Sequence, residues 1–329
     1  MAVPRITIIT PMFNEEASFG AYVEAVERIL LSRTDAHYDI LFIDDGSTDR
    51  TWKLMEAQCR VSGRYRALRL SRNFGAHAAE TAGLDCCDAE AVATLPADLQ
   101  DPPETIVTFV KAWSDGADIV WGHRRSRAES WQRAWASKFF ASLLRRFAMP
   151  RGSKFTTGGF FLIDRKVVEC VRQFREQSRL TFGIVAWTGF RQEIVQYDRQ
   201  ERLMGKSNWS YSRMVIAMYD ALIGFSYAIP RMVTMVGVAF SLVGFLAAGL
   251  FLLNAILSHP VPGWSGIMIT LMLFFGITFL ILGIICEYLM RIYREAVQRP
   301  IYFIAEDTAG QFQEARALKK FQRPLRQPH

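Results

Sequence analysis

The sequence predicts an α/β domain with a largely parallel sheet, followed by a hairpin of two membrane-spanning helices. Short apolar runs of strand type alternate with helical segments over roughly the first 120 residues, and polar clusters follow several of these runs. Two long uncharged apolar segments come later, at residues 232–257 and 264–286. The alternation indicates helices on both faces of one sheet. Each apolar segment exceeds the ~20 residues that cross a bilayer as a helix.

The expected strands are short runs rich in β-branched, aromatic and other apolar residues. They are Arg5–Thr10, Tyr38–Ile43, Tyr65–Leu70, Ala91–Leu95 and Asp118–Gly122. Helices are expected between them, at 17–31, from Thr48 or Asp49 to about Cys59, from His77 to Leu84, and from Pro102-Pro103-Glu104 onwards. Proline suits the first turn of a helix, which supports the last of these. Ligands of such sheets bind at the carboxyl ends of the strands.

The second half of the chain is organised around the two apolar segments. The loop between them, Ser258–Gly263, holds no Lys or Arg, whereas Arg231 precedes the pair and Arg291 follows it. The positive-inside rule therefore places this loop outside and both termini in the cytoplasm. The alternative of two buried core helices is disfavoured, because core helices rarely run this long without a charge.

Four regions are expected from this organisation. They are a cytoplasmic domain at 1–210, an amphipathic interfacial helix at 211–230, the hairpin at 231–290 and a basic cytoplasmic tail at 291–329. A further segment, residues 131–147, mixes aromatic, aliphatic and basic residues at helical spacing. It is either a second interfacial helix or a helix packed on the domain.

Composition and charge indicate which kinds of partner the chain binds. The formal net charge is +7, and the basic residues lie largely in and around the segments that flank the two apolar segments. Anionic lipid headgroups and phosphate ligands explain this excess, and no nucleic-acid-binding motif is present. The five cysteines form no CxxC pair and the five histidines are dispersed, which argues against a zinc site. No apolar leader opens the sequence, so we expect the first domain to stay in the cytoplasm.

Two polar clusters follow the first two expected strands. Residues 11–16 read PMFNEE and residues 44–49 read DDGSTD. Each alone is typical of turns, where Asn, Asp, Gly and Ser are favoured. At one edge of one sheet they form a plausible nucleotide pocket, because carboxylates accept hydrogen bonds from a base N–H or from ribose hydroxyls.

The ordered set PMFNEE, IDDGSTD, LSRNFG and ADLQDPPE closely resembles the motifs of family 2 glycosyltransferases with the GT-A fold. The two apolar segments, together with GKSNW at 205–209, narrow the resemblance to one group within this family. The chain looks like a polyisoprenyl-phosphate glycosyltransferase, similar to dolichol-phosphate mannose synthase and bactoprenol glucosyltransferases, over roughly residues 6–304. The resemblance implies a Rossmann-like mixed sheet and an inverting transfer from a UDP-sugar or similar donor to undecaprenyl phosphate. The reaction would take place on a bacterial inner membrane and would contribute to the synthesis of cell-envelope polysaccharide.

The resemblance also assigns roles to residues. The nucleotide would be lined by Pro11, Phe13, Glu15, Asp44, Asp45, Asp98 and Gln100. Asp98 ends the family's metal-binding DxD motif and would hold Mg²⁺ or Mn²⁺. The lipid phosphate would be gripped by Arg202, Lys206 and Ser207, and the catalytic set would be Asp98, Arg124, Arg202 and Lys206. Fixed cations and a divalent ion suit a diphosphate leaving group that gains charge.

Two departures from the family pattern stand out. The DxD position reads Pro96-Ala97-Asp98, so its first carboxylate is missing, and Gly159 stands where many relatives carry an acid. Asp164 comes later and is expected to cap the next helix. A phosphate acceptor is already mostly dianionic at neutral pH, so little proton remains for a base to remove.

Two other functions are weighed against this one. The missing acids are compatible with a catalytically inactive membrane scaffold or partner subunit. A processive polysaccharide synthase is disfavoured, because no QxxRW motif is present and two spans do not line a polymer channel without forming a homo-oligomer. The sugar, the exact lipid and the oligomeric state are left open by the sequence.

Overall fold

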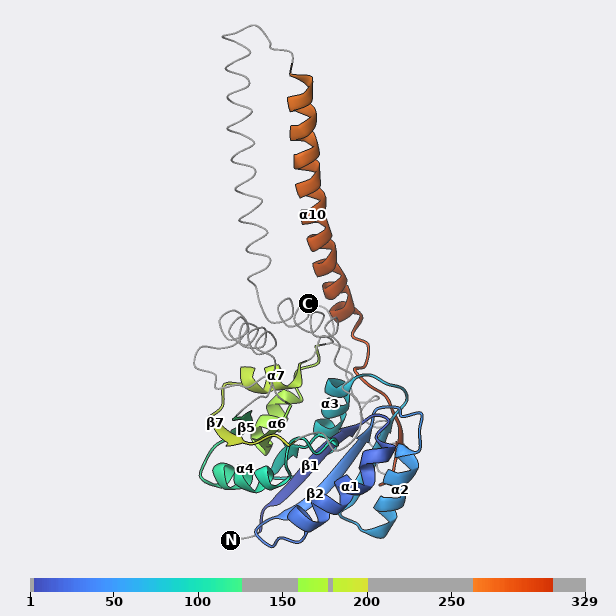
Figure 1. The fold of residues 1–329 in the computed structure, drawn as a ribbon, viewed down its shortest axis with the longest axis vertical. Helices are drawn as coiled ribbons and strands as arrows, with labels where there is room; N and C mark the ends of the chain where they lie inside the picture. Colours follow the sequence, from blue (N-terminus) through green and yellow to red (C-terminus); the bar gives the residue numbers. More distant parts are fainter. Residues whose placement is uncertain (1–2, 126–158, 177–179, 201–262, 310–329) are drawn as a thin grey trace, which may run out of the picture. The chain divides into compact units, whose positions relative to one another are not determined.

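The computed structural model describes residues 3–125, 159–176, 180–200 and 263–309 (Figure 1). The chain divides into two units, one of residues 1–214 with 300–329 and the other of residues 215–299. The first unit holds the sheet and the helices that cover it. Of the second unit, the described part is one long helix.

The described residues of the first unit form an eight-stranded sheet in the order β7-β5-β6-β4-β1-β2-β3-β8. Its strands are β1 (Arg5–Met12), β2 (His37–Asp44), β3 (Tyr65–Leu70), β4 (Ala91–Thr94), β5 (Ile119–Arg124), β6 (Phe161–Asp164), β7 (Gln192–Tyr197) and β8 (Ile304–Asp307). All neighbours pair in parallel except β6, which runs antiparallel to β4 and β5, and β8, which runs antiparallel to β3. The five expected strands are confirmed, and the mixed sheet matches the expected fold.

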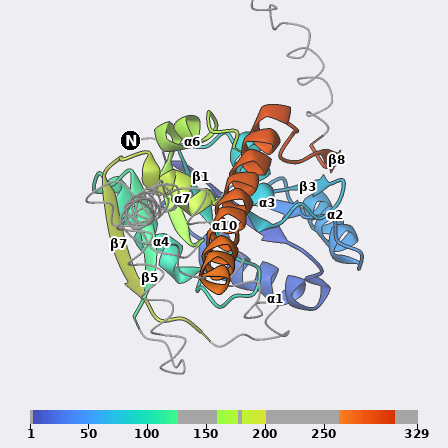
Figure 2. The same ribbon diagram turned by 90° about the horizontal axis from the view of Figure 1, so that it is seen from above.

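Helices cover both faces of this sheet, as the alternation predicts (Figures 1 and 2). They are α1 (Glu16–Val26), α2 (Thr51–Val61), α3 (Ala76–Cys86), α4 (Glu104–Ser114), α6 (Arg165–Val171) and α7 (Thr181–Trp187), and α1 continues into a π-helical turn at Glu27–Leu31. Successive side chains of a strand point to opposite faces. In β1, Ile8 belongs to the core shared with α1, α2 and α4, whereas a side chain added at Gly83 of α3 would meet Ile9.

Part of the expected basic tail is an element of the sheet. β8 pairs with β3, and two ion pairs of 2.8 Å flank the pairing, Arg66 to Asp307 and Arg69 to Glu306. The indole Nε1 of Trp52 also donates to Glu306 at 3.2 Å. No local alternation of strand and helix marks β8 in the sequence, and its partners lie more than 200 positions away. The chain therefore returns to the first unit after its apolar segments.

The expected hairpin falls largely outside the described residues. α10 (Trp264–Val297) coincides with the second apolar segment and extends beyond it. The first segment at 232–257 and the expected interfacial helices at 211–230 and 131–147 lie outside the described residues. None of the helices in the described part of the chain combines the length and the apolar character that crossing a bilayer requires.

Candidate active site

The candidate site lies where six parallel strands end. β1, β2, β3, β4, β5 and β7 all run in the same direction, so their carboxyl ends share one edge of the sheet. The loops that follow them carry the polar motifs of the sequence. Ligands bind at this edge in open α/β sheets, because the loops diverge there and leave backbone and side-chain polar groups exposed.

The loops after β1 and β2 are fastened to each other. The backbone N–H of Asn14 donates to Ser47 Oγ at 2.9 Å, and the N–H of Thr48 donates back to Asn14 Oδ1 at 2.9 Å. The N–H of Glu15 donates to Thr51 Oγ1 at 2.9 Å. Several polar side chains of the two motifs therefore brace the loops, as turn chemistry would have them do.

The expected nucleotide residues of the first loop keep accessible surface. Pro11, the last residue but one of β1, is half-buried, and Phe13, the first residue after β1, is 39% exposed. The Glu15 carboxylate is partly buried and accepts a 2.5 Å hydrogen bond from Ser18. An exposed aromatic ring beside a proline suits stacking against a planar base. Their contact with a nucleotide stays a prediction.

The paired aspartates at the end of β2 face inward. Asp44 is fully buried, accepts from the Ser47 N–H at 3.0 Å and lies 3.3 Å from Arg69 Nε. Asp45 is also buried, and its two oxygens accept from the backbone N–H groups of Phe74 at 2.7 Å and Gly75 at 2.9 Å. Burial raises the pKa of Asp45, while these two hydrogen bonds act in the opposite direction. Asp45 thus anchors the SRNFG loop to the DDGSTD loop.

Gly46 makes this close approach of the two loops sterically feasible, which gives a stability prediction. Its φ is +70°, and an added Cβ would lie 2.4 Å from the carbonyl carbon of Arg72. Left-handed backbone costs ~1–2 kcal/mol for a residue with a Cβ, and overpacking against backbone adds ~1–3 kcal/mol. We expect Gly46→Ala to lower the free energy of unfolding by about 2–5 kcal/mol in urea titrations.

The matched control is Gly20→Ala. Gly20 lies inside α1, and nothing would lie within 4 Å of its added Cβ. Alanine there should raise the free energy of unfolding by ~0.5–1 kcal/mol, because glycine weakens a helix interior. Equal effects of the two substitutions would contradict the close packing of the loops.

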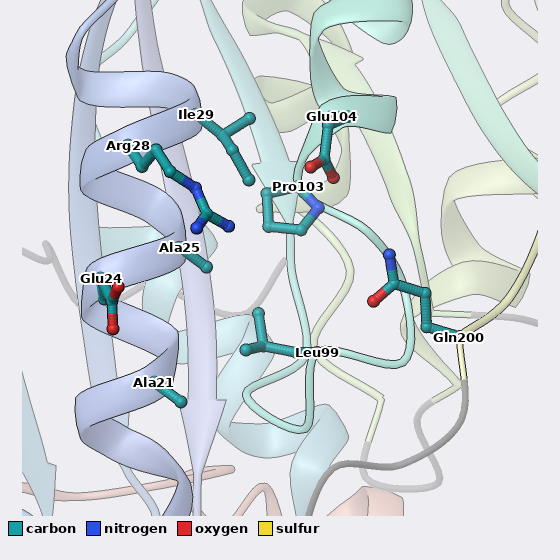
Figure 3. Close-up of a pocket in the computed structure, with 9 residues that line it drawn as sticks. All are labelled: Ala21, Glu24, Ala25, Arg28, Ile29, Leu99, Pro103, Glu104 and Gln200. Atoms are coloured by element: carbon teal, nitrogen blue, oxygen red, sulfur yellow. The ribbon is translucent and has the colours of Figure 1, made fainter.

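The loop after β4 presents the expected metal residues. Asp98 is half-buried, and its Oδ1 accepts from the Gln100 N–H at 3.2 Å. Between them, Leu99 has a φ of +52° and is buried. Figure 3 shows its side chain directed into a small cavity of about 180 Å³ beside α1, lined also by Ile29 and Pro103. The turn thus buries Leu99, while the residues on either side of it in the sequence, Asp98 and Gln100, both carry side-chain oxygens.

The donor set of this loop fits a hard divalent cation. A carboxylate and an amide oxygen are ligands that Mg²⁺ and Mn²⁺ accept, and Mg²⁺ usually keeps several waters. Within the described ranges, no group of three or more His, Cys, Asp or Glu side chains gathers to hold a metal ion. Substrate oxygens and water are further ligands that a cation at Asp98 would accept.

A buried polar group that the sequence analysis did not single out lies directly beyond this loop. Asp101 accepts a hydrogen bond from the hydroxyl of Tyr197 at the end of β7, and Arg199 Nε lies 3.6 Å from it. The expected phosphate residue Arg124 ends β5, paired in register with Tyr197. Asp101 and Tyr197 are almost 100 positions apart, so no local sequence signal could have joined them.

Gly159, where an acid is missing, has a carboxylate next to it. A Cβ at Gly159 would lie 3.2 Å from Oε1 of Glu80, a buried residue of α3. The other oxygen of Glu80 lies 3.3 Å from Nδ1 of His77. Asp164 caps α6, accepting from the Lys166 N–H at 2.9 Å, so its expected capping role is confirmed. Glu80 was missed because nothing in the sequence places α3 beside residue 159.

This arrangement predicts a charge conflict in Gly159→Asp. The carboxylate introduced by this substitution would lie close to that of Glu80. We expect the free energy of unfolding at pH 7 to be about 1–3 kcal/mol lower than that of the wild type. Like charges raise a carboxyl pKa in the folded state, so the deficit should shrink as the pH falls to 5 and one acid becomes protonated. Unfolding measured at both pH values tests this.

Two variants separate charge from size. Gly159→Asn has the same volume without the charge, and Glu80→Gln removes the repulsion within the Gly159→Asp chain. Both should unfold with less pH dependence than Gly159→Asp. If Gly159→Asn loses as much stability as Gly159→Asp at pH 7, the effect is steric and the conflict is absent.

The remaining expected site residues, Arg202, Lys206 and Ser207, lie outside the described residues. The last described residue before them is Gln200, which follows β7 at the same edge of the sheet. Chain connectivity therefore starts their segment at the candidate site.

Comparison with known proteins matches this chain to one protein family and to several of its members. The family model described as "Glycosyl transferase family 2" matches residues 7–172. An uncharacterised glycosyltransferase of Synechocystis is 35% identical over 92% of this chain and 95% of its own length. An undecaprenyl-phosphate 4-deoxy-4-formamido-L-arabinose transferase of Proteus mirabilis is 31% identical, over 92% of this chain and 93% of its own. A prophage-derived bactoprenol glucosyl transferase of Shigella flexneri is 29% identical, over 93% and 99%.

Proposed function

Because the chain belongs to glycosyltransferase family 2, we propose that it transfers a sugar from a UDP-sugar or similar donor to a polyisoprenyl phosphate. Undecaprenyl phosphate is the proposed acceptor, and the cytoplasmic face of a bacterial inner membrane is the proposed place. The observation that carries this proposal is that the loops with the expected nucleotide and metal residues, and Arg124 at the end of β5, lie at one edge of the sheet. The names of the relatives from Proteus and Shigella support the choice of acceptor.

The donor would lie over the carboxyl ends of β1, β2 and β4. Pro11 and Phe13 would line the base, and the aspartates Asp44 and Asp45 would fix the loops around base and ribose. Asp98, with Gln100 beside it, would hold Mg²⁺ or Mn²⁺ on the diphosphate. When bound, such a cation neutralises charge that develops on the leaving nucleoside diphosphate.

The acceptor phosphate would attack the anomeric carbon from the opposite side, with inversion. Arg124 at the end of β5, together with Arg202 and Lys206, would hold the phosphate oxygens in line. Fixed cations of this kind need no reorganisation during the reaction, which makes them effective. No general base is required, because the phosphate is already mostly dianionic at neutral pH.

We further propose that residues 232–257 and 264–286 form a membrane hairpin whose outer ends face the cytoplasm. Two uncharged segments longer than ~20 residues support the hairpin. Connectivity supports the orientation, because only residues 298–303 separate α10 from β8 of the catalytic sheet. A hydrophobic hairpin would bring the soluble domain to the lipid phosphate, which cannot leave the bilayer.

The test is turnover by purified protein in detergent. Undecaprenyl phosphate, Mg²⁺ and a panel of nucleotide-sugars are supplied, and release of nucleoside diphosphate is measured. One donor should be turned over only when lipid phosphate is present. An inactive scaffold would turn over no donor and would not bind UDP with metal in calorimetry. Binding of UDP without turnover of any donor would contradict the proposed acceptor.

A further inference from the structure

A set of contacts between the loop after β4 and the end of β7 connects the two halves of the candidate site. We infer that Asp101 is a positioning residue that holds the loop after β4, which carries Asp98, in register with the carboxyl ends of β5 and β7, where Arg124 lies. This inference rests on the proposed function, because it concerns how donor and acceptor are aligned. The contacts are made by Asp101, Tyr197, Arg199 and the backbone of Gln100 and Gln200.

The centre of these contacts is the hydrogen bond from the Tyr197 hydroxyl to Asp101 Oδ1. Asp101 is 4% exposed and Tyr197 7% exposed, so water does not compete for the bond. The Tyr197 ring is held edge-on against Phe160, with the ring centroids 5.3 Å apart. Burial, followed by the negative charge of Asp101, raises the pKa of Tyr197, and Arg124 opposes that shift. Tyr197 therefore stays a neutral donor at any physiological pH.

Charge balance makes Asp101 hard to replace. The carboxylate lies 3.6 Å from Nε of Arg199, a buried atom that makes no hydrogen bond within the part of the chain that the structure describes. Removing one partner of a buried charge pair leaves the other uncompensated, which is costly. Asp101 thus fixes both the ring at the end of β7 and the first arginine after it.

A backbone hydrogen bond adds to this set of contacts. The Gln200 N–H donates to the Gln100 carbonyl oxygen at 2.9 Å. Figure 3 shows Gln200 beside the loop that carries Leu99 and Pro103, and all three line one cavity. The bond joins Gln100 of the proposed metal loop directly to the residue that follows Arg199.

The consequence for catalysis follows from the strand register. Arg124, one of the proposed phosphate-holding residues, ends β5 and is paired in register with Tyr197 of β7. Loosening the bond between Asp101 and Tyr197 would therefore let the ends of β5 and β7 shift relative to the loop after β4. The proposed metal residue Asp98 belongs to that loop and not to β5 or β7, so donor binding should depend on the Asp101 contact less than acceptor alignment does.

The test compares donor and acceptor in Asp101→Asn and Tyr197→Phe, both close in shape to the native residues. We expect the KM for undecaprenyl phosphate to rise about tenfold in each variant, while the Kd for UDP with Mg²⁺ changes less than twofold. Asp88→Asn is the matched control, because Asp88 makes an exposed ion pair with Arg165, and its constants should equal those of the wild type.

A double-variant cycle covers the case in which Asp101→Asn folds poorly. Arg199→Gln removes the opposite charge, and Asp101→Asn with Arg199→Gln should lose less than the product of the two single losses, because the buried charges then balance again. Losses that multiply independently would overturn the pairing. Single variants with lower kcat but unchanged acceptor KM would show a merely structural role and overturn the inference.

Failure of the proposed function would look different. In that case the wild-type protein itself would form no lipid-linked sugar with any donor, and the positioning role would fall with it. A wild type that forms product, beside an Asp101→Asn variant with unchanged acceptor KM, would overturn only the positioning role.

Discussion

Asp98→Asn is expected to lower the kcat of sugar transfer by roughly 10²–10³-fold. Asn keeps the size of the side chain but loses the charge that would hold the divalent cation on the diphosphate. Loss of one preorganised group that stabilises transition-state charge typically costs this much. The effect should be large because the first position of the motif is Pro96, so no second carboxylate of this motif remains to share the cation.

Metal titration separates this role from a general loss of activity. The variant should need a higher Mg²⁺ or Mn²⁺ concentration for half-maximal rate, and excess metal should restore part of the activity. Asp115→Asn, at the exposed C-terminal end of α4, is the control and should behave as wild type. An Asp98→Asn enzyme with wild-type rate and metal dependence would contradict the assignment.

The second large effect is expected for Lys206→Met. The substitution removes a cation that would grip the phosphates while it keeps a long flexible side chain. We expect about a 10²-fold loss of kcat/KM for the lipid phosphate, since fixed cations act on charge that develops in the reaction. The assignment comes from the place of Lys206 in the GKSNW motif, because the residue lies outside the described part of the chain.

Two comparisons sharpen this prediction. Lys206→Arg should recover part of the rate, because the charge persists with different geometry. Lys166→Met is the control: Lys166 pairs with Asp118 at 2.6 Å on an exposed part of the domain, away from the strands' carboxyl ends. Loss of activity in Lys166→Met equal to that in Lys206→Met would remove the case for a specific phosphate contact.

The sequence predicts those strands that carry a complete pattern of their own. β1 to β5 are short apolar runs bounded by turn residues, and the first four helices alternate with them. β6, β7 and β8 lie beyond Gly122, where the regular alternation of strands and helices that marks even the four-residue β4 fades. β8 is held instead by ion pairs with β3, a long-range interaction that only the fold brings about.

The candidate site shows the same division. The motifs predicted which loops gather at one edge, because parallel strands present their carboxyl ends together. They did not predict which polar groups brace the loops. Both oxygens of Asp45, for example, accept hydrogen bonds from backbone N–H groups of the neighbouring loop. They also missed Asp101 with Tyr197 and Glu80 with Gly159, since each pair is joined across elements far apart in the chain.

In the proposed reaction, one sugar is placed on the phosphate of a membrane lipid. Its most direct test is a mass spectrum of the lipids formed when membranes containing this protein, or its Asp98→Asn variant, receive the nucleotide-sugar donor. We expect a species of polyisoprenyl phosphate plus one sugar residue, formed by the wild type and strongly reduced with the variant. A polymeric product, or the same lipid-linked sugar in equal amount with both proteins, would contradict it.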